Sequence, residues 1–183
     1  CQVVLSALRV SGLEEKVTHG HHELKKTRRH FDVAHVLGTI GSYAGSAGLA
    51  YLTNNLTRSP YLSAALGSSV GDYLGYEAGF TPYWYLKNSD RYKGIKGKGK
   101  FIKDWTSFTV KSIPVEIGAY AANVPAALLG TALTGGNPVL GTLLGGVAVD
   151  LLSWAGLRYF NKSKLREIAE EKLKYNGTPA YAH

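Results

Sequence analysis

Residues 60–87 read PYLSAALGSSVGDYLGYEAGFTPYWYLK, and this stretch decides the fold of the chain. It is apolar and glycine-rich for long enough to cross a bilayer, yet it carries Asp72 near its middle and Glu77 further on. Glycines recur at every fourth position, on one ridge of a helix where a neighbouring backbone can come close. They are Gly67, Gly71, Gly75 and Gly79. A carboxylate at mid-bilayer costs at least about 2.5 kcal/mol, so Asp72 is expected to face protein or water rather than lipid.

Residues 138–163 repeat this plan 78 positions later, as PVLGTLLGGVAVDLLSWAGLRYFNKS. The paired positions are Pro60 with Pro138, Leu62 with Leu140, Leu66 with Leu144, Gly67 with Gly145, and Asp72 with Asp150. Gly141 and Gly145 are the packing glycines of this second copy. The segments before the two copies also match, at an offset of 77, and the matches include Phe31 with Phe108, Gly41 with Gly118, and Tyr43 with Tyr120.

These matches predict a duplicated hairpin of two membrane spans. An even number of crossings gives both copies the same orientation, so a pseudo-twofold axis would lie along the membrane normal. Chance similarity between glycine-rich apolar segments is the alternative, and the aspartates at matched depth argue against it.

Lysine and arginine are clustered in a way that favours a membrane protein over a nucleic-acid-binding protein. The chain has 183 residues and a net charge of +8, with 21 Lys and Arg. Six of these lie in the first 30 residues, seven between Lys87 and Lys103, and six from Arg158 to Lys174. With four spans, the three blocks fall on one side, which is the positive-inside pattern and places both termini in the cytoplasm. Nucleic-acid binding needs one basic face on a folded surface, so no nucleic acid is expected as a partner.

The predicted fold is therefore all-α: an integral membrane four-helix bundle in the plasma membrane, built from two duplicated helical hairpins. An interfacial amphipathic helix precedes it, with Val4, Leu5 and Leu8 at helical spacing, and a charged cytoplasmic helix follows it. The segments are a basic segment at 1–30, the first hairpin at 31–87, a basic cytoplasmic loop at 88–104, the second hairpin at 105–160, and a charged tail at 161–183. Anionic lipid at the basic face is the expected partner, together with a second copy or another membrane subunit.

Five charged side chains inside the predicted spans are candidate pathway residues. A rise of about 1.5 Å per residue places Asp72, Asp150 and Glu116 near the midplane. Glu77 and Lys111 lie nearer the cytoplasm at matching heights, which predicts an ion pair between them. The remaining carboxylates cannot all stay ionised in a low dielectric, so at least one is expected to hold a proton or a cation. Alternatively, these residues only satisfy helix backbones, tyrosine hydroxyls and each other.

Histidine and cysteine add little to this picture. His35, one turn into the first span, is a further candidate for the polar interior. His19, His21 and His22 do not have the spacing of a defined metal site, and a basic arm is the simpler interpretation. The single cysteine, Cys1, excludes an internal disulfide and a thiolate metal cluster. No metal ligand is assigned, and any cofactor is unknown.

Three functions fit these features. The first is a carrier, flippase or permease component with an acidic site at the repeat interface. Two hairpins joined by a basic loop resemble the layout of GtrA-type proteins, which are associated with moving polyprenyl-linked sugars, although no motif matches and midplane acids are not part of that pattern. The second is a structural or assembly subunit whose glycine ridges drive helix association. The third is an intramembrane aspartyl hydrolase that uses Asp72 and Asp150 as a dyad. Residues 69–72 resemble the GxGD pattern of membrane-embedded aspartyl proteases but lack its first glycine.

Overall fold

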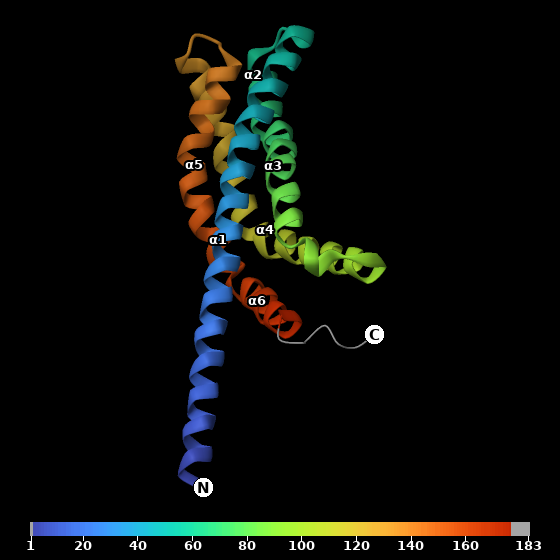
Figure 1. Ribbon diagram of the computed structural model, residues 1–183. Helices are drawn as coiled ribbons and strands as arrows, with labels where there is room; N and C mark the ends of the chain where they lie inside the picture. The colour runs from blue at the N-terminus through green and yellow to red at the C-terminus, as the bar shows by residue number, and fades with distance from the viewer. Residues whose placement is uncertain (1, 177–183) are drawn as a thin grey trace.

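In the computed structural model most helices run up and down along one long axis, whereas residues 162–176 and the helix that begins at residue 94 project obliquely at one end (Figure 1). It describes the backbone of residues 2–176 and the side chains of residues 21–147, 149, 150 and 153–174. Residues 2–176 contain no β-strand. The predicted all-α class is therefore confirmed, whereas the membrane-embedded bundle of duplicated hairpins stays a prediction.

The elements follow one another with short connections. In chain order they are α1 (Gln2–Thr57), α2 (Pro60–Leu66), the π-helical turn η1 (Gly67–Gly71), α3 (Asp72–Lys87), the 3-10 turn η2 (Ser89–Tyr92), α4 (Gly94–Leu133), α5 (Pro138–Phe160) and α6 (Lys162–Asn176). Pro60 and Pro138 each begin a helix, where a missing backbone N–H costs nothing. Gly135 and Gly136 turn the chain into α5 with φ of +68° and +88°, which side chains with a Cβ rarely allow.

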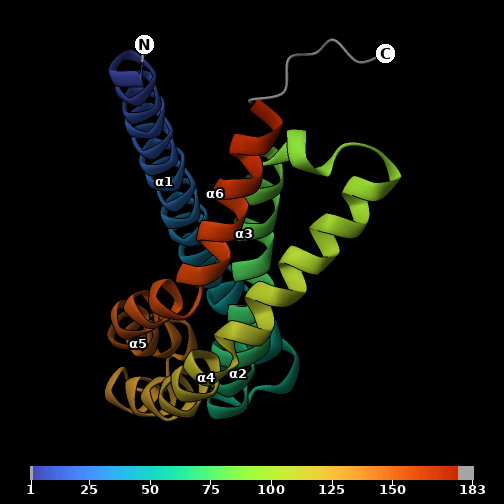
Figure 2. The same ribbon diagram turned by 90° about the horizontal axis from the view of Figure 1, so that it is seen from below.

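The two short turns lie at one end of the molecule and the basic segments lie at the other (Figure 1). The turn from α1 to α2 and the turn from α4 to α5 are at the top of the view. The first part of α1, the connection from α3 to α4, and α6 are at the bottom. At this end α6 packs against α1 and α4 (Figure 2). The fold thus brings the three basic blocks of the sequence to the same end.

Two boundaries differ from the sequence-based ones. Helix α1 is continuous from Gln2 to Thr57, so the backbone shows no break between residues 1–30 and the first span. The predicted apolar face of Val4, Leu5 and Leu8 lies outside the described side chains. Residues 94–104, predicted as part of a loop, belong to α4.

Tertiary contacts explain why this glycine- and lysine-rich run is helical despite weak intrinsic propensity. A Cβ atom on Gly97 would lie 2.8 Å from Tyr92 Cα, so the helix packs directly on the chain of η2. Further along, Asp104 is 1% exposed and pairs with Arg91. These contacts depend on how η2 folds back on α4, which helix propensity alone does not indicate.

Glycines let α3 lie directly on α1. A Cβ on Gly71 would lie 2.6 Å from the Gly45 carbonyl oxygen, and one on Gly75 would lie 2.7 Å from the Gly41 carbonyl carbon. The remaining packing glycines of the sequence analysis are similarly tight, with Gly67 on Ser46, Gly79 on Leu37, Gly141 on Thr131 and Gly145 on Ala127. The first ridge therefore joins α3 to α1, and the glycines of α5 join it to α4.

Many large aliphatic side chains lie on the outside of the helices, whereas the inside holds a mainly aromatic core and many small polar side chains. Ile40 is 59% exposed and Ile117 is 65% exposed. Other exposed apolar residues include Val36, Leu37, Leu52, Leu62, Val70, Leu74, Val110, Ile113, Leu129, Leu140, Leu144 and Val147. The buried polar residues include Ser42, Ser46, Ser63, Ser68, Ser112, Asn123, Thr131 and Thr142. This is the reverse of the usual arrangement in water, where large aliphatic side chains are buried.

Among the described residues, α4 (Gly94–Leu133) is the one helix that is long and apolar enough to cross a membrane by length and composition. A single helix of this kind does not establish a membrane protein. The second predicted span is divided into α2, η1 and α3, of 7, 5 and 16 residues, because a π turn interrupts it. Multiple crossings of a membrane therefore stay a prediction.

Candidate functional site

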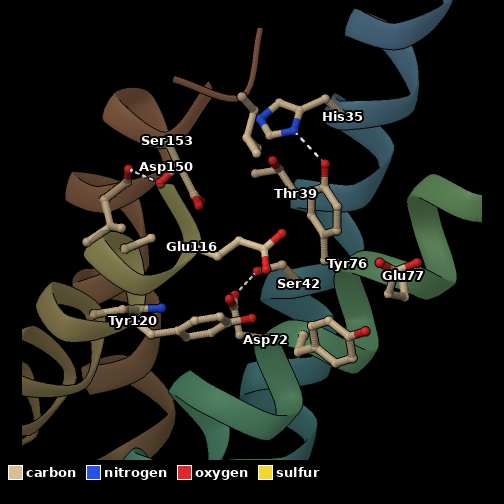
Figure 3. A pocket seen from close by; sticks show the side chains of 15 residues that line it. His35, Thr39, Ser42, Asp72, Tyr76, Glu77, Glu116, Tyr120, Asp150 and Ser153 are labelled. Carbon is tan, nitrogen blue, oxygen red and sulfur yellow. Dashed lines mark hydrogen bonds between the residues drawn. The ribbon is translucent and has the colours of Figure 1, made fainter. Parts of the chain in front are cut away.

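A cavity of about 70 Å³ lies among α1, α3, α4 and α5, and four carboxylates line it (Figure 3). They are Asp72, Glu77, Glu116 and Asp150. The other polar lining residues are His35, Thr39, Ser42, Tyr73, Tyr76, Tyr120, Asn123 and Ser153. Five of the six pathway residues predicted from the sequence thus lie on this acidic cavity, and Lys111 does not.

The π turn η1 ends where Asp72 begins α3. The Asp72 N–H bonds back to the Gly67 carbonyl, which is the i to i−5 pattern of a π-helix, and such single turns are frequent at functional sites. From α4, the Asn123 side chain donates to the Ser68 carbonyl at 3.2 Å, so it fixes the turn to the opposite wall of the cavity. Residues 67–71 are poor helix formers, but the sequence analysis assigned these glycines to packing alone.

Two consecutive residues of α1 each place a hydroxyl group against one of the two aspartates of the cavity. Ser42 donates to Asp72, and the Tyr43 hydroxyl hydrogen-bonds with Asp150. Asp150 Oδ2 is buried and has no hydrogen-bond partner in the described part of the chain. The two aspartates therefore enter the cavity from α3 and α5, and each is held separately against α1.

Histidine and tyrosine close the end of the cavity that faces the basic segments. His35 is 6% exposed, and its Nδ1 lies 2.8 Å from the Tyr76 hydroxyl. One of these two groups donates and the other accepts, according to the tautomer of the ring. The His35–Tyr76 pair joins α1 to α3, as Figure 3 shows.

The predicted ion pair between Glu77 and Lys111 is wrong. Glu77 Oε2 instead accepts from Thr81 Oγ1 at 2.6 Å and from Trp105 Nε1 at 3.1 Å, and Lys111 Nζ donates to Ser163 Oγ at 3.0 Å. The height argument gives the depth of a side chain but not its direction. Trp105 and Lys111 are six residues apart on α4, a rotation of about 240° at 3.6 residues per turn, so they point to different sides.

The four acids are spread around the cavity. Among the described residues, no three His, Cys, Asp or Glu side chains are close enough to hold one metal ion. Exchange of protons or of a hydrated cation suits such a spread arrangement better than a dehydrated ion held by several carboxylates, which needs converging oxygen ligands.

Four aromatic rings separate this cavity from the basic end. We call Phe31, Phe80, Trp84 and Phe108 the aromatic cluster; its ring centroids lie 5.2 to 6.5 Å apart. Each ring is further along its helix toward the basic end than the cavity residues, as Phe80 is beyond Tyr76. The rings of Tyr76 and Phe80 stack at 5.6 Å, so the cluster continues directly from the cavity wall.

Positions that the proposed duplication pairs do not all have equivalent contacts in the structure. Phe31 and Phe108, paired by the sequence matches, contact each other in the aromatic cluster at 5.7 Å. Gly41 packs on the backbone of Gly75, but a Cβ on its counterpart Gly118 would meet open space. The two copies thus use matched positions differently, and an internal repeat stays a prediction.

Beyond the aromatic cluster lies a set of buried charges that the sequence analysis missed. Asp104 accepts from Arg91 Nε at 2.9 Å and from a second guanidinium nitrogen at 3.1 Å, and Lys164 Nζ lies 2.9 Å from the same carboxylate. Arg91 also pairs with Glu171, and the Tyr92 hydroxyl donates to Asp104 at 3.1 Å. This buried ion network joins η2, α4 and α6.

Lys164 is held in this network by opposite charges and hydrogen bonds. Burial alone would lower the pKa of Lys164, but hydrogen bonds and charge from Glu167 and Asp104 raise it above its usual value. Because the paired residues are 13 to 80 positions apart, no local sequence pattern announces them. The only signal of these pairs in the sequence is that residues 88–104 and α6 carry charges of opposite sign.

The chain matches no protein-family model, and neither a curated protein nor a solved structure is significantly similar to it.

Proposed function

We propose that this chain is a small polytopic membrane protein that acts as a carrier, flippase or permease component. The observation that carries this proposal is the acidic cavity, in which four carboxylates are enclosed by helices whose outer surface is apolar. Intramembrane acids are costly and usually face a protein interior or a pathway for ions or substrate.

The outer surface supports membrane embedding. Apolar residues such as Ile40, Leu62, Leu74, Ile117 and Leu144 are about half exposed or more. In water they would form apolar patches that soluble monomers rarely carry. The basic segments gather at one end, which favours that end as the cytoplasmic one and the plasma membrane as the location.

The membrane proposal predicts that the chain needs detergent to leave the membrane. After expression, we expect it to stay in the membrane pellet through an alkaline carbonate wash and to dissolve in a mild detergent, because its apolar outer surface has no other suitable solvent. Western blotting of pellet and supernatant measures this. A monodisperse protein in detergent-free buffer would contradict the proposal.

The acids support transport rather than a purely structural role. Like charges that share a dry cavity cannot all be ionised, so the site exchanges protons or holds a cation as its surroundings change. The cavity also lies where the pair α1 and α3 meets the pair α4 and α5, and carriers often bind their cargo at such a junction.

The carrier proposal predicts that Asp72→Asn and Asp150→Asn each reduce proton flux. We expect the initial rate of dye-reported acidification in proteoliposomes to fall at least about tenfold, equivalent to about 1.4 kcal/mol, because an amide cannot release a proton. Both variants should insert and purify like the wild type.

The matched control is Asp90→Asn, which removes an exposed carboxylate outside the cavity and should leave the flux unchanged. Equal flux in wild type, Asp72→Asn and Asp150→Asn would contradict the carrier and favour an assembly subunit. Peptide cleavage lost with either aspartate would instead favour a hydrolase.

The contact of the α3 glycines with α1 of the same chain leaves that ridge unavailable to a partner.

A further inference from the structure

A second pocket, of about 170 Å³, lies at the basic end and is distinct from the acidic cavity. Helix α1, the end of α3, η2 and α6 form its walls. Its lining residues are Glu23, Lys26, His30, Lys87, Asn88, Asp90, Arg91 and Lys172. Side chains more than 140 positions apart converge here, so the pocket is a product of the fold and not of one basic stretch.

Most negative charge around this basic pocket is already paired. Asp90 is bound to Lys93 at 2.6 Å, and Glu23 lies 3.9 Å from Lys26. Arg91 is neutralised by the buried ion network.

The ammonium groups of Lys87 and Lys172 form no ion pair within the described part of the chain. Lys26, whose side chain is 53% exposed, has only the long 3.9 Å contact with Glu23, so it can also turn to an anion. Lys87 lies over the ring of Tyr83, at 5.7 Å from its centroid. The pocket therefore has an excess of positive charge.

Buried polar atoms in the wall lack partners. His30 Nδ1 and Asn88 Oδ1 are buried without a hydrogen bond in the described structure. Burial lowers the pKa of His30, and Lys172, Lys26 and Lys87 lower it further. Burial also lowers the pKa of Lys172; Glu23 and Asp90 oppose this shift, whereas Lys26 and Arg91 add to it. Cations held together at such a cost are typical of a site that an anion completes, because the anion offsets their mutual repulsion.

We propose that the basic pocket binds a phosphate group, with Lys87, Lys172 and Lys26 as charge partners and His30 as a hydrogen-bond donor. A phosphate oxygen accepts several charge-assisted hydrogen bonds at once, which suits ammonium groups from three separate helices. The phosphate group can belong to a phospholipid head group or to free phosphate. Lys87 follows the aromatic residues Tyr83, Trp84 and Tyr85, a pattern typical of the membrane interface, where phospholipid head groups lie. The binding step does not depend on transport by the acidic cavity.

The test is binding by the full chain in a neutral detergent. Titrations with inorganic phosphate, with short-chain phosphatidic acid and with short-chain phosphatidylcholine are followed by the shift in thermal midpoint. We expect phosphatidic acid to bind, and Lys172→Gln and Lys26→Gln each to weaken binding about tenfold, the effect of losing one charge-assisted hydrogen bond. The matched control Lys98→Gln removes an exposed charge of α4 outside the pocket and should change binding less than about twofold.

The probes separate the two sources. Binding of both inorganic phosphate and phosphatidic acid shows that the phosphate suffices, and binding of phosphatidic acid alone shows a head-group site. A second readout is the NMR titration of His30, assigned with His30→Asn: a bound phosphate should raise the pKa of His30. Equal binding by Lys172→Gln and Lys98→Gln, or no binding of either phosphate probe to the wild type, overturns the proposal. An unchanged proton flux in the Asp72→Asn variant, which would contradict the carrier, leaves the phosphate site untouched.

Discussion

Gly41→Leu is expected to prevent α1 and α3 from packing, whereas Gly48→Leu on the same helix is expected to be harmless. A Cβ on Gly41 would overlap the Gly75 carbonyl oxygen and lie 3.1 Å from its carbon, so a leucine must force two backbones apart. A Cβ on Gly48 would meet nothing within 4 Å. The two variants therefore place the same substitution on one helix, once where a neighbouring backbone lies and once where no atom is close.

The expected loss for Gly41→Leu is at least about 3 kcal/mol, the upper part of the overpacking range, since a backbone yields less than a side chain. For a chain of this size that corresponds to a fall of about 10 °C in the thermal midpoint. Midpoint and monodispersity in detergent are the measurements. A folded, monodisperse Gly41→Leu with an unchanged midpoint would show that α1 and α3 are not in contact as described.

Asp104→Asn is expected to release α6 from the rest of the molecule. Asp104 is 1% exposed and holds both Arg91 and Lys164, so the amide would leave two buried cations without their common counter-charge. Breaking a buried pair from one side costs roughly 3–5 kcal/mol, because an uncompensated charge remains inside.

Limited trypsin digestion measures this change, since an undocked α6 exposes the cleavage site at Lys164, which is 2% exposed in the docked helix. Asp90→Asn is the matched control: it removes an exposed carboxylate that pairs only with Lys93, and digestion should proceed as in the wild type. Identical digestion of Asp104→Asn and the wild type would be incompatible with a role for the buried ion network in holding α6.

The sequence predicts the features that are local along a helix. Periodic glycines identify the face of α3 that contacts α1, and prolines identify where α2 and α5 begin. The rise per residue puts Asp72, Glu116 and Asp150 at similar depths, and all three line one cavity. Each of these inferences needs only helix geometry, which residues a few positions apart determine.

Features that depend on direction or on distant partners were out of reach. The rotation of α4 decides that Trp105, and not Lys111, meets Glu77. The five-residue π turn η1 likewise changes the rotation of the α3 residues that follow it. The helical start of α4 depends on contacts with η2 and on the Arg91–Asp104 pair. The sequence analysis placed a basic loop there, whereas packing on η2 makes residues 94–104 helical.

The aromatic cluster lies between the acidic cavity and the buried ion network. Tyr76 turns its hydroxyl toward His35 on one side, and Trp84 turns its N–H toward Tyr92 on the other. Beside the rings, Glu77 of the cavity accepts hydrogen bonds from Thr81 and Trp105. The rings of Phe31, Phe80 and Trp84 interlock edge to face, and one of them cannot swing aside without displacing another. The packing of these rings therefore couples the positions of α1 and α3, because a shift of one helix displaces rings that belong to the other.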